Sequence, residues 1–272
     1  MENFISFFEH LSSLQKFLWI VSCMAAFWIL ENIFPLAKFS YKKWKHARVN
    51  LFLLTTTIII NVVFGLITAG VFIWAGENDF GLLYQVEPPI WLEFLFGLML
   101  LDLFAQYIVH YLLHRIKFMW RFHMVHHSDT EVDVTTGTRH HPGDYVFREL
   151  FALVAILIGG IPFWVYMFYR ITTVLCTYWT HANLKMPKGV DKLLSYILIT
   201  PNMHKFHHHF ERPWTDSNFG NIFSFWDRIF GTFVYDDPSK IKYGLDVLDD
   251  TQSTNLGYQL KVPFNNSIKT DY

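Results

Sequence analysis

The chain has 272 residues, of which 52% are hydrophobic and 17% are charged. Because soluble domains are on average about a quarter charged, this composition indicates a membrane protein. The formal net charge of −1 offers no attraction to a polyanion, so nucleic acid is not an expected partner. Only two cysteines are present, Cys23 and Cys176, and both lie in apolar runs. Neither a disulfide framework nor a thiolate metal site is therefore expected.

Three apolar stretches are long enough to cross a bilayer, which takes about 20 helical residues. They are Leu14–Leu36, Leu51–Ala75 and Ile90–His114. A fourth apolar block, Phe147–Thr180, would be about 50 Å long as one straight helix, which is too long for a single crossing. Because Gly-Gly-Ile-Pro at 159–162 interrupts this block, two helices that form a hairpin are expected.

The loops between the apolar stretches differ in charge. Residues 37–50 include four lysines and one arginine, whereas residues 76–89 include three acidic residues and neither lysine nor arginine. Since basic loops remain in the cytoplasm, the first loop is expected there and the second outside. With a hairpin in the fourth block, the twelve histidines between His110 and His209 then all lie at or beyond the cytoplasmic face.

These features together predict an all-α fold in a single membrane domain. Its expected architecture is a helical bundle of three spans plus a helical hairpin, with a cytoplasmic cap of histidine-rich helices. Residues 1–101 are expected to be mainly transmembrane helices, 102–235 the histidine-motif region and 236–272 a polar cytoplasmic tail.

Histidine spacing is the strongest functional signal. Residues i, i+3 and i+4 share one face of a helix. Eight histidines have this spacing within three groups: His110 and His114; His123, His126 and His127; and His204, His207 and His208. Without a metal, buried imidazoles would lose hydration and repel one another on protonation. One metal ion has about four to six coordination positions. Eight potential ligands exceed this number, so the pattern predicts two metal ions.

Several motifs resemble the fatty acid hydroxylase/sterol desaturase superfamily, whose members are integral membrane di-iron enzymes with histidine ligands. The motifs are His110–His114, RFHMVHH (121–127), RHHP (139–142), THANL (180–184), TPNMHKFHHH (200–209) and NFGNIFSFWDRIFGTF (218–233). The similarity runs from about Asp102 to Tyr235. Through the patterns R-x-H-P and H-x-N, it implies two further metal ligands, His141 and His181, which gives ten in all.

Other polar residues are expected near the ligands, and no catalytic residue beyond the metal ligands is predicted. The candidates for orienting or surrounding them are Asp102, Asn183, Asp216, Asn218, Asp227, His140 and His209. Asp102 lies about 12 Å along the helix from His110, so it is expected either to orient other groups or to pack helices. Asp227 is expected either to accept a hydrogen bond from a ligand histidine or to pair with Arg228.

The resemblance implies an oxidoreductase that uses O2 and two electrons to hydroxylate an unactivated C–H bond of a lipid. Fatty acyl, sterol, sphingoid and alkylglycerol lipids are the expected substrate types, and desaturation at the same site is the alternative. Two iron ions are expected because the reaction needs a redox change, although zinc can occupy such a site in an isolated sample. HPGD (141–144) is similar to the haem motif of cytochrome b5 but has no separate domain around it.

An external electron donor of ferredoxin, rubredoxin or cytochrome b5 type, with its reductase, is therefore expected. A multi-pass protein of a bacterial inner membrane is favoured over one of the endoplasmic reticulum. A divalent-metal transporter would place its ligands near the bilayer midplane, whereas these histidines are predicted at the edge. A zinc-dependent membrane hydrolase usually carries a glutamate among its ligands, as in H-E-x-x-H, and neither H-x-x-H-H contains one.

Overall fold

The computed structural model describes residues 1–212 and 214–270, and its regular structure in these ranges is helical. The helices are α1 (Glu2–Glu9), α2 (Ser13–Ile33), α3 (Lys43–Glu77), α4 (Leu82–Val86), α5 (Ile90–Asp102), η1 (Leu103–Ile108), α6 (Val109–Arg115), α7 (Lys117–His127), η2 (Val134–Thr138), α8 (Pro142–Gly159), α9 (Phe163–His181), α10 (Lys188–Leu194), α11 (Pro201–His207), η3 (Trp214–Asp216), α12 (Phe225–Ile229), η4 (Pro238–Lys240), η5 (Asp250–Gln252), α13 (Leu256–Lys261) and η6 (Val262–Phe264). The predicted all-α fold is confirmed.

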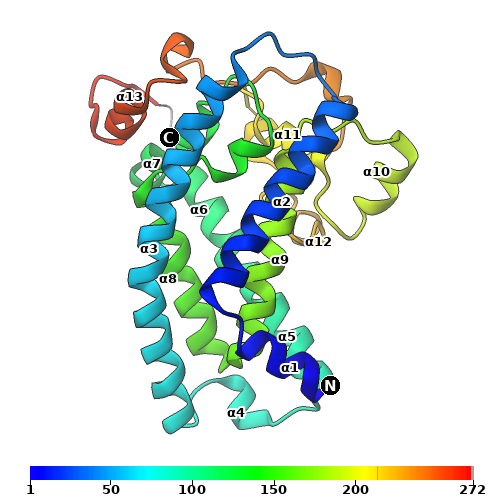
Figure 1. The fold of residues 1–272 in the computed structure, drawn as a ribbon, viewed down its shortest axis with the longest axis vertical. Helices are drawn as coiled ribbons and strands as arrows, with labels where there is room; N and C mark the ends of the chain where they lie inside the picture. The colour runs from blue at the N-terminus through cyan, green and yellow to red at the C-terminus, as the bar shows by residue number, and fades with distance from the viewer. Residues whose placement is uncertain (213, 271–272) are drawn as a thin grey trace.

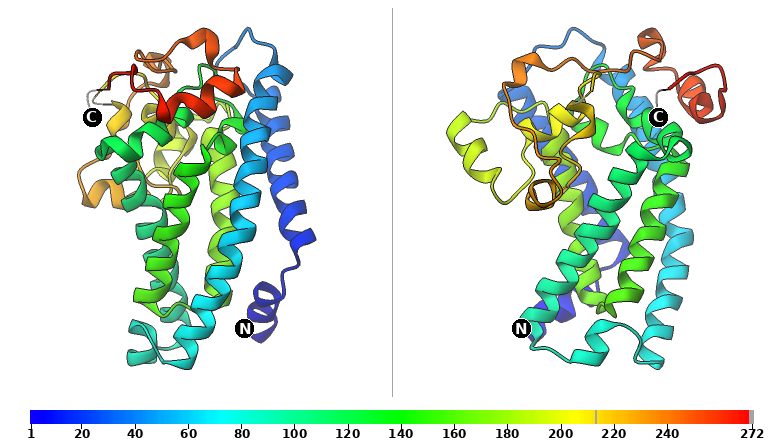
Figure 2. Two further views of the ribbon diagram at one scale, coloured as in Figure 1. Left: turned by 90° about the vertical axis from the view of Figure 1, so that its left-hand side faces the viewer. Right: turned by 180° about the vertical axis from the view of Figure 1, so that it is seen from behind.

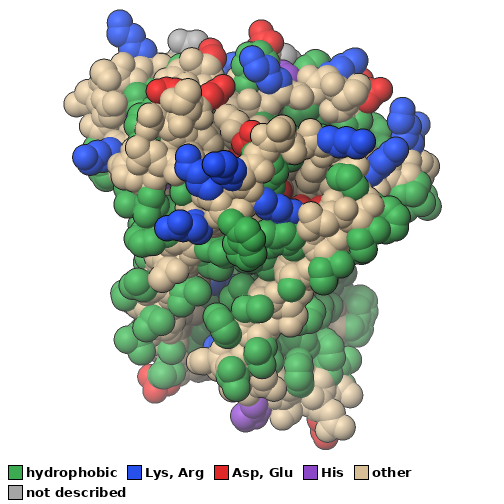
Figure 3. Space-filling view, turned by 45° about the horizontal axis from the view of Figure 1, so that its top comes forward, with side chains coloured by type: hydrophobic (Ala, Val, Ile, Leu, Met, Phe, Trp, Pro, Cys, Tyr) green, Lys and Arg blue, Asp and Glu red, His purple; other side chains and the backbone are tan. Residues whose placement is uncertain are grey.

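Among the residues that the structure describes, three segments are long and apolar enough to cross a membrane, as predicted. They are Ser13–Ile33, Lys43–Val86 and Ile90–Arg115. The third combines α5, the π-helical η1 and α6. Helices α2, α3, α8 and α9 run along the long axis of the molecule, with α4 at one end and α7 and α11 towards the other (Figure 1). Hydrophobic side chains cover much of the surface between the ends, as expected for a face in contact with lipid (Figure 3).

Helix α3 begins at Lys43 rather than at Leu51, so the prediction of a loop over residues 37–50 is wrong for its second half. Lysine, arginine and alanine are good helix formers, and the helix continues past its apolar part. His46 and Asn50 on this extension are buried. His46 lies 2.7 Å from an Asp129 carboxylate oxygen, and the Asn50 side chain donates to the Thr135 hydroxyl. The extension therefore holds the segment that follows α7.

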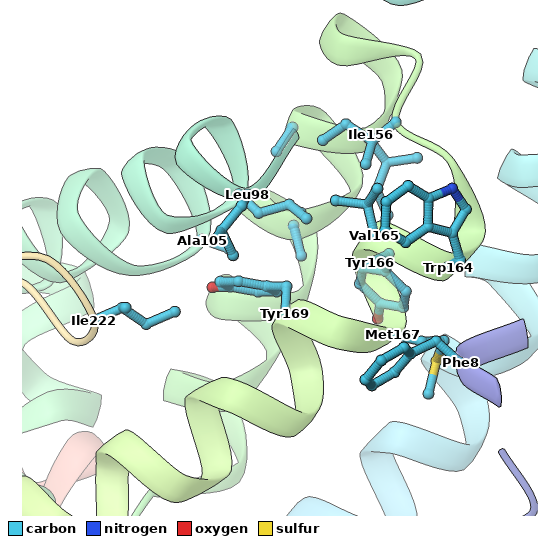
Figure 4. Packing of buried hydrophobic residues seen from close by; sticks show 14 of the residues in the cluster. Phe8, Leu98, Ala105, Ile156, Trp164, Val165, Tyr166, Met167, Tyr169 and Ile222 are labelled. Atoms are coloured by element: carbon cyan, nitrogen blue, oxygen red, sulfur yellow. The ribbon is translucent and has the colours of Figure 1, made fainter. Parts of the chain in front are cut away.

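The predicted helical hairpin is present as α8 and α9. Helix α8 ends at Gly159 and is followed by the C-cap Gly160, whose φ of 62° is in the left-handed region that glycine tolerates, and Pro162 is the N-cap of α9. The two helices pack with α5 around a core that includes Leu98, Ile156 and Tyr169 (Figure 4). The hairpin returns the chain to the end of the bundle at which α7 lies (Figure 1).

An ion pair between a half-buried arginine and a buried glutamate joins the two helices of the hairpin. The Arg170 guanidinium on α9 donates to the Glu149 carboxylate on α8 at 2.6 Å. A second guanidinium nitrogen donates to the Asn61 side chain on α3 and to the Tyr145 hydroxyl. An unpaired charge among apolar helices is costly, so the pair and its neutral partners link α3, α8 and α9.

The polar tail packs on the helices of the bundle. Leu245, Val262 and Ile268 form a hydrophobic cluster with Leu53 of α3 and Met124 of α7. The Arg121 guanidinium on α7 donates to two backbone carbonyls of residues 263 and 265, each at 2.6 Å. The tail therefore covers α7, and it lies beside the end of α3 that begins the second span (Figure 2).

Candidate metal centre

Nine histidines converge at one end of the bundle in two adjoining groups. The group of five consists of His110, His114, His123, His127 and His207, and the group of four consists of His126, His181, His204 and His208. Within each group, one potential ligand atom per residue lies within 4.8 Å of all the others. The groups are in contact, since the rings of His123 and His126 are 5.2 Å apart and those of His127 and His208 are 4.8 Å apart. All nine side chains are buried.

The separations between ring nitrogens suit ligands of a common ion. In the group of five, the Nε2 atoms of His110 and His123 are 3.0 Å apart, and those of His114 and His127 are 3.1 Å apart. In the group of four, the Nε2 atom of His181 lies 3.0 Å from that of His204. Two nitrogens that bind one ion at about 2.1 Å are about 3.0–3.4 Å apart in octahedral or tetrahedral geometry.

Four helices end at these groups. The last turns of α6, α7, α9 and α11 each carry at least one of the clustered histidines. Helix α11 starts at Pro201, with the Thr200 hydroxyl accepting a hydrogen bond from the backbone of Met203. Because the carboxyl end of a helix carries partial negative charge, four such ends favour cations between them.

Hydrogen bonds donated by Nδ1–H fix the orientation of several imidazoles. Four rings donate Nδ1–H to backbone carbonyls: His110 to Phe219 (2.8 Å), His126 to Arg139 (3.3 Å), His181 to Thr177 (2.7 Å) and His207 to Ser217 (2.8 Å). A ring that donates through Nδ1 presents a lone pair at Nε2, which is the form that binds a metal.

Two carboxylates orient two further rings. The Nδ1 atom of His114 lies 3.3 Å from the Asp216 carboxylate, and that of His123 lies 3.1 Å from the Asp144 carboxylate. Asp216 is one of the residues predicted to play this part. Sequence reasoning missed Asp144, although it lies within the HPGD motif. Its position three residues after the histidine of the R-x-H-P pattern could have indicated that Asp144 lies near the ligands.

The donor set fits metal ions. Among the described residues, His207 Nε2 and both ring nitrogens of His208 are buried without a hydrogen-bond partner. Burial first, and the neighbouring imidazoles second, lower the pKa of His126, His127 and His207 well below the usual value. Burial lowers the pKa of His123 to about 3 despite Asp144. Neutral imidazoles with buried, unused lone pairs are the chemical state that a cation requires.

The structure does not bring His141, a predicted ligand, into either group. Proline at the first position of α8 puts His141 at the N-cap, where its Nδ1 accepts the backbone N–H of Gly143 at 3.0 Å. Its ring lies against Phe122 and Phe264. His140 lies closer to the centre, because its ring stacks on His126 at 4.6 Å and its Nδ1 is 2.8 Å from Asp144.

Asp102 and Asp227 hold the segment beside the centre. Asp102 accepts the backbone N–H groups of residues 222 and 223 and the Trp226 indole N–H, which corresponds to the packing role among its two alternatives. Asp227 accepts the backbone N–H of Phe219, whose carbonyl binds His110. Asp227 therefore acts on a histidine through Phe219 rather than by direct contact.

The remaining predicted residues tie other segments together. Asn218, with a φ of 54°, donates to the carbonyls of Met203 and Val234. Asn183 donates to the carbonyl of residue 37 and accepts its N–H. His209 accepts the backbone N–H of residue 242 and packs on Trp214. These residues connect neighbouring segments by hydrogen bonds to the backbone and belong to neither histidine group.

The comparisons with known proteins agree with this geometry. A sequence model described as fatty acid hydroxylase matches residues 94–232, a range that contains all nine clustered histidines. The chain belongs to the fatty acid hydroxylase family. No solved structure matches it.

Three relatives show how this fatty acid hydroxylase family member compares with characterised proteins. Alkylglycerol monooxygenase from Homo sapiens is 29% identical over 73% of this chain and 41% of the relative. Ornithine lipid hydroxylase from Rhizobium tropici is 30% identical over 53% of the chain and 43% of the relative. Alkylglycerol monooxygenase from Xenopus tropicalis is 32% identical over 64% of the chain and 37% of the relative. The chain thus spans about two fifths of the length of these relatives.

Replacing Asp144 with asparagine tests the link between the carboxylate and the metal centre of this family member. The substitution removes the charge that orients His123 and His140, and it leaves the Arg148 guanidinium, 3.1 Å from Asp144, without its carboxylate. Loss of such a partner is expected to weaken metal binding by about 10–100-fold. Chelator competition measures the change, with Asp246→Asn on the exposed surface as the matched control. Equal metal retention in both variants would count against the role of Asp144.

The metal-free protein is expected to lose stability in mild acid. The pKa values of His126, His127, His204, His207 and His208 are all lowered in the folded state. The unfolded chain binds protons on these residues below about pH 6.5 while the folded chain does not, so the free energy of unfolding falls as pH falls. Thermal unfolding in chelator from about pH 8 to 5 measures this trend, and a flat melting temperature would contradict it.

Proposed function

We propose that this chain is a membrane-bound hydroxylase of an unactivated C–H bond in a lipid. The observation that carries the proposal is the presence of nine buried histidines in two adjoining groups within a chain of the fatty acid hydroxylase family. In the balanced reaction, one C–H bond, one O2, two electrons and two protons give one alcohol and one water. An external donor of ferredoxin, rubredoxin or cytochrome b5 type would supply the electrons through its reductase.

The two histidine groups would each hold one iron ion. Bound iron supplies the redox chemistry that activates O2 and oxidises the C–H bond. The chain keeps the imidazoles neutral through burial and holds four of them by backbone carbonyls and two by carboxylates. The surrounding apolar side chains exclude bulk water, and Phe219 packs on the rings of His110 and His207.

The proposed substrate has a polar headgroup and an aliphatic chain. Support comes from the names of the relatives, which are a monooxygenase of alkylglycerols and a hydroxylase of ornithine lipids. The position of the histidines at one end of an apolar bundle suits a headgroup near that end and a chain along the helices. Both names describe oxygen insertion, so hydroxylation is preferred to desaturation.

We also propose that the histidine end faces the cytoplasm. The basic residues before and within the first turns of α3 lie at that end, which supports this orientation by the positive-inside rule. The division into transmembrane helices, histidine-motif region and tail remains part of the proposal. A bacterial inner membrane remains the location predicted from the sequence.

Lipid analysis under labelled oxygen tests this function. Cells that express the full chain are grown with ¹⁸O2, and their lipids are compared with those of cells that express His126→Ala or His207→Ala. Hydroxylation is expected to add one labelled oxygen atom to a lipid class only in cells with the unaltered chain. Loss of two hydrogens without label would establish desaturation. Identical lipids in all cells, with the protein present and iron bound, would overturn the proposal.

A further inference from the structure

The exposed face of α3 changes from basic to hydrophobic side chains within about one helical turn. Lys45 and Arg48 are exposed near its start, whereas Phe52 and Ile59 are exposed further along, at 46% and 60%. A lipid-facing helix shows this change where the hydrocarbon meets the headgroups. Arg48 and Phe52 are four residues apart, so the boundary lies within a stretch of about 6 Å along the helix axis.

The C-terminal tail makes a groove at this boundary. Thr254, just before α13, and Leu256, its first residue, face α3 across a hollow of about 570 Å³. The α3 side is lined by Lys45, Arg48, Val49, Leu51, Phe52 and Thr55. Its volume is in the range of binding sites for small molecules. The groove therefore has two cations at its headgroup side and apolar side chains towards the hydrocarbon.

The two cations are available to a ligand. Lys43, at the start of the same helix, is paired with Glu31 at 2.8 Å. Among the described residues, Lys45 and Arg48 make no ion pair. Two unpaired positive charges above an apolar wall match a ligand that carries a negative headgroup and a hydrocarbon chain.

We propose that this groove binds one anionic phospholipid from the surrounding membrane. Its phosphate contacts Lys45 and Arg48, and one acyl chain lies along Phe52 and Thr55. The bound lipid touches both α3 and the start of α13. Since the tail covers α7 through Leu53, Met124 and Val262, the lipid would also steady the helix that carries three of the clustered histidines.

Native mass spectrometry of the full chain in neutral detergent tests this site with phosphatidylglycerol or phosphatidylcholine as the probe. One phosphatidylglycerol per chain is expected to remain bound. Each basic residue near an anionic headgroup contributes roughly fivefold in affinity, so Lys45→Glu/Arg48→Glu is expected to bind at least roughly thirtyfold more weakly. Lys185→Glu/Lys192→Glu, which changes two exposed lysines around α10, is the charge-matched control and is expected to bind normally.

Two further arms distinguish a bound lipid from a phosphate group held by charge alone. Thr55→Trp fills the apolar part of the groove without changing its charge, and it is expected to weaken phosphatidylglycerol binding while the melting temperature without lipid stays unchanged. Inorganic phosphate alone is expected not to raise the melting temperature, because it lacks the chain. Equal binding of the two lipids, or undiminished phosphatidylglycerol binding by Lys45→Glu/Arg48→Glu, would overturn the proposal.

Discussion

Replacing His208 with alanine is expected to abolish the proposed lipid hydroxylation and to prevent the proposed binding of a metal ion by the group of four. Both ring nitrogens of His208 are buried without a partner among the described residues, and its ring lies 4.6 Å from that of His126. Loss of a partner that only orients a ligand costs about 10–100-fold in metal affinity, so loss of a ligand is expected to cost more than about 100-fold. Iron content per chain and product formation measure the effect.

The adjacent histidine provides the matched control. His209 is also buried, yet it lies outside both groups, where it accepts the backbone N–H of Lys242 and packs on Trp214. His209→Ala is expected to lower stability by about 1 kcal/mol, the net contribution of one hydrogen bond, and to keep its iron. Equal iron content and equal activity in the two variants would show that His208 is not a metal ligand.

Replacing Arg170 with methionine is expected to destabilise the bundle by about 3–5 kcal/mol, because it leaves the Glu149 carboxylate buried and unpaired. Glu149→Met is expected to have a similar effect, because it leaves the Arg170 guanidinium without its carboxylate partner. The double variant removes both charges and is expected to be more stable than either single variant, although Asn61 and Tyr145 lose their guanidinium partner. Reversible unfolding in detergent measures the stability of all three variants. A loss of stability in the double variant equal to the sum of the two single losses would contradict the pairing.

Local periodicity explains why much of the centre could be predicted from the sequence. The spacing i, i+3, i+4 is a property of one helix, and both copies of H-x-x-H-H lie at the ends of helices, α7 and α11. Hydropathy likewise predicted the three spans, and Gly160 predicted the hairpin turn. These features depend on neighbouring residues in the chain, which the sequence displays directly.

Features that depend on distant contacts were not accessible in the same way. The pattern R-x-H-P implied His141 as a ligand, but the proline that marks the pattern also makes His141 the cap of α8. The role of Asp144 depends on His123 lying opposite it, 21 residues away in the chain. His46 and Asp129 are 83 residues apart and meet because α3 extends beyond its apolar part. Spacing along the chain carries no information about such pairs.

Anomalous scattering at the iron edge from crystals of the iron-loaded protein would show directly whether each of the two histidine groups binds one metal ion. Two peaks are expected, one enclosed by His110, His114, His123, His127 and His207 and the other by His126, His181, His204 and His208. A single peak, or a peak ligated by His141 in place of either group, would contradict this expectation.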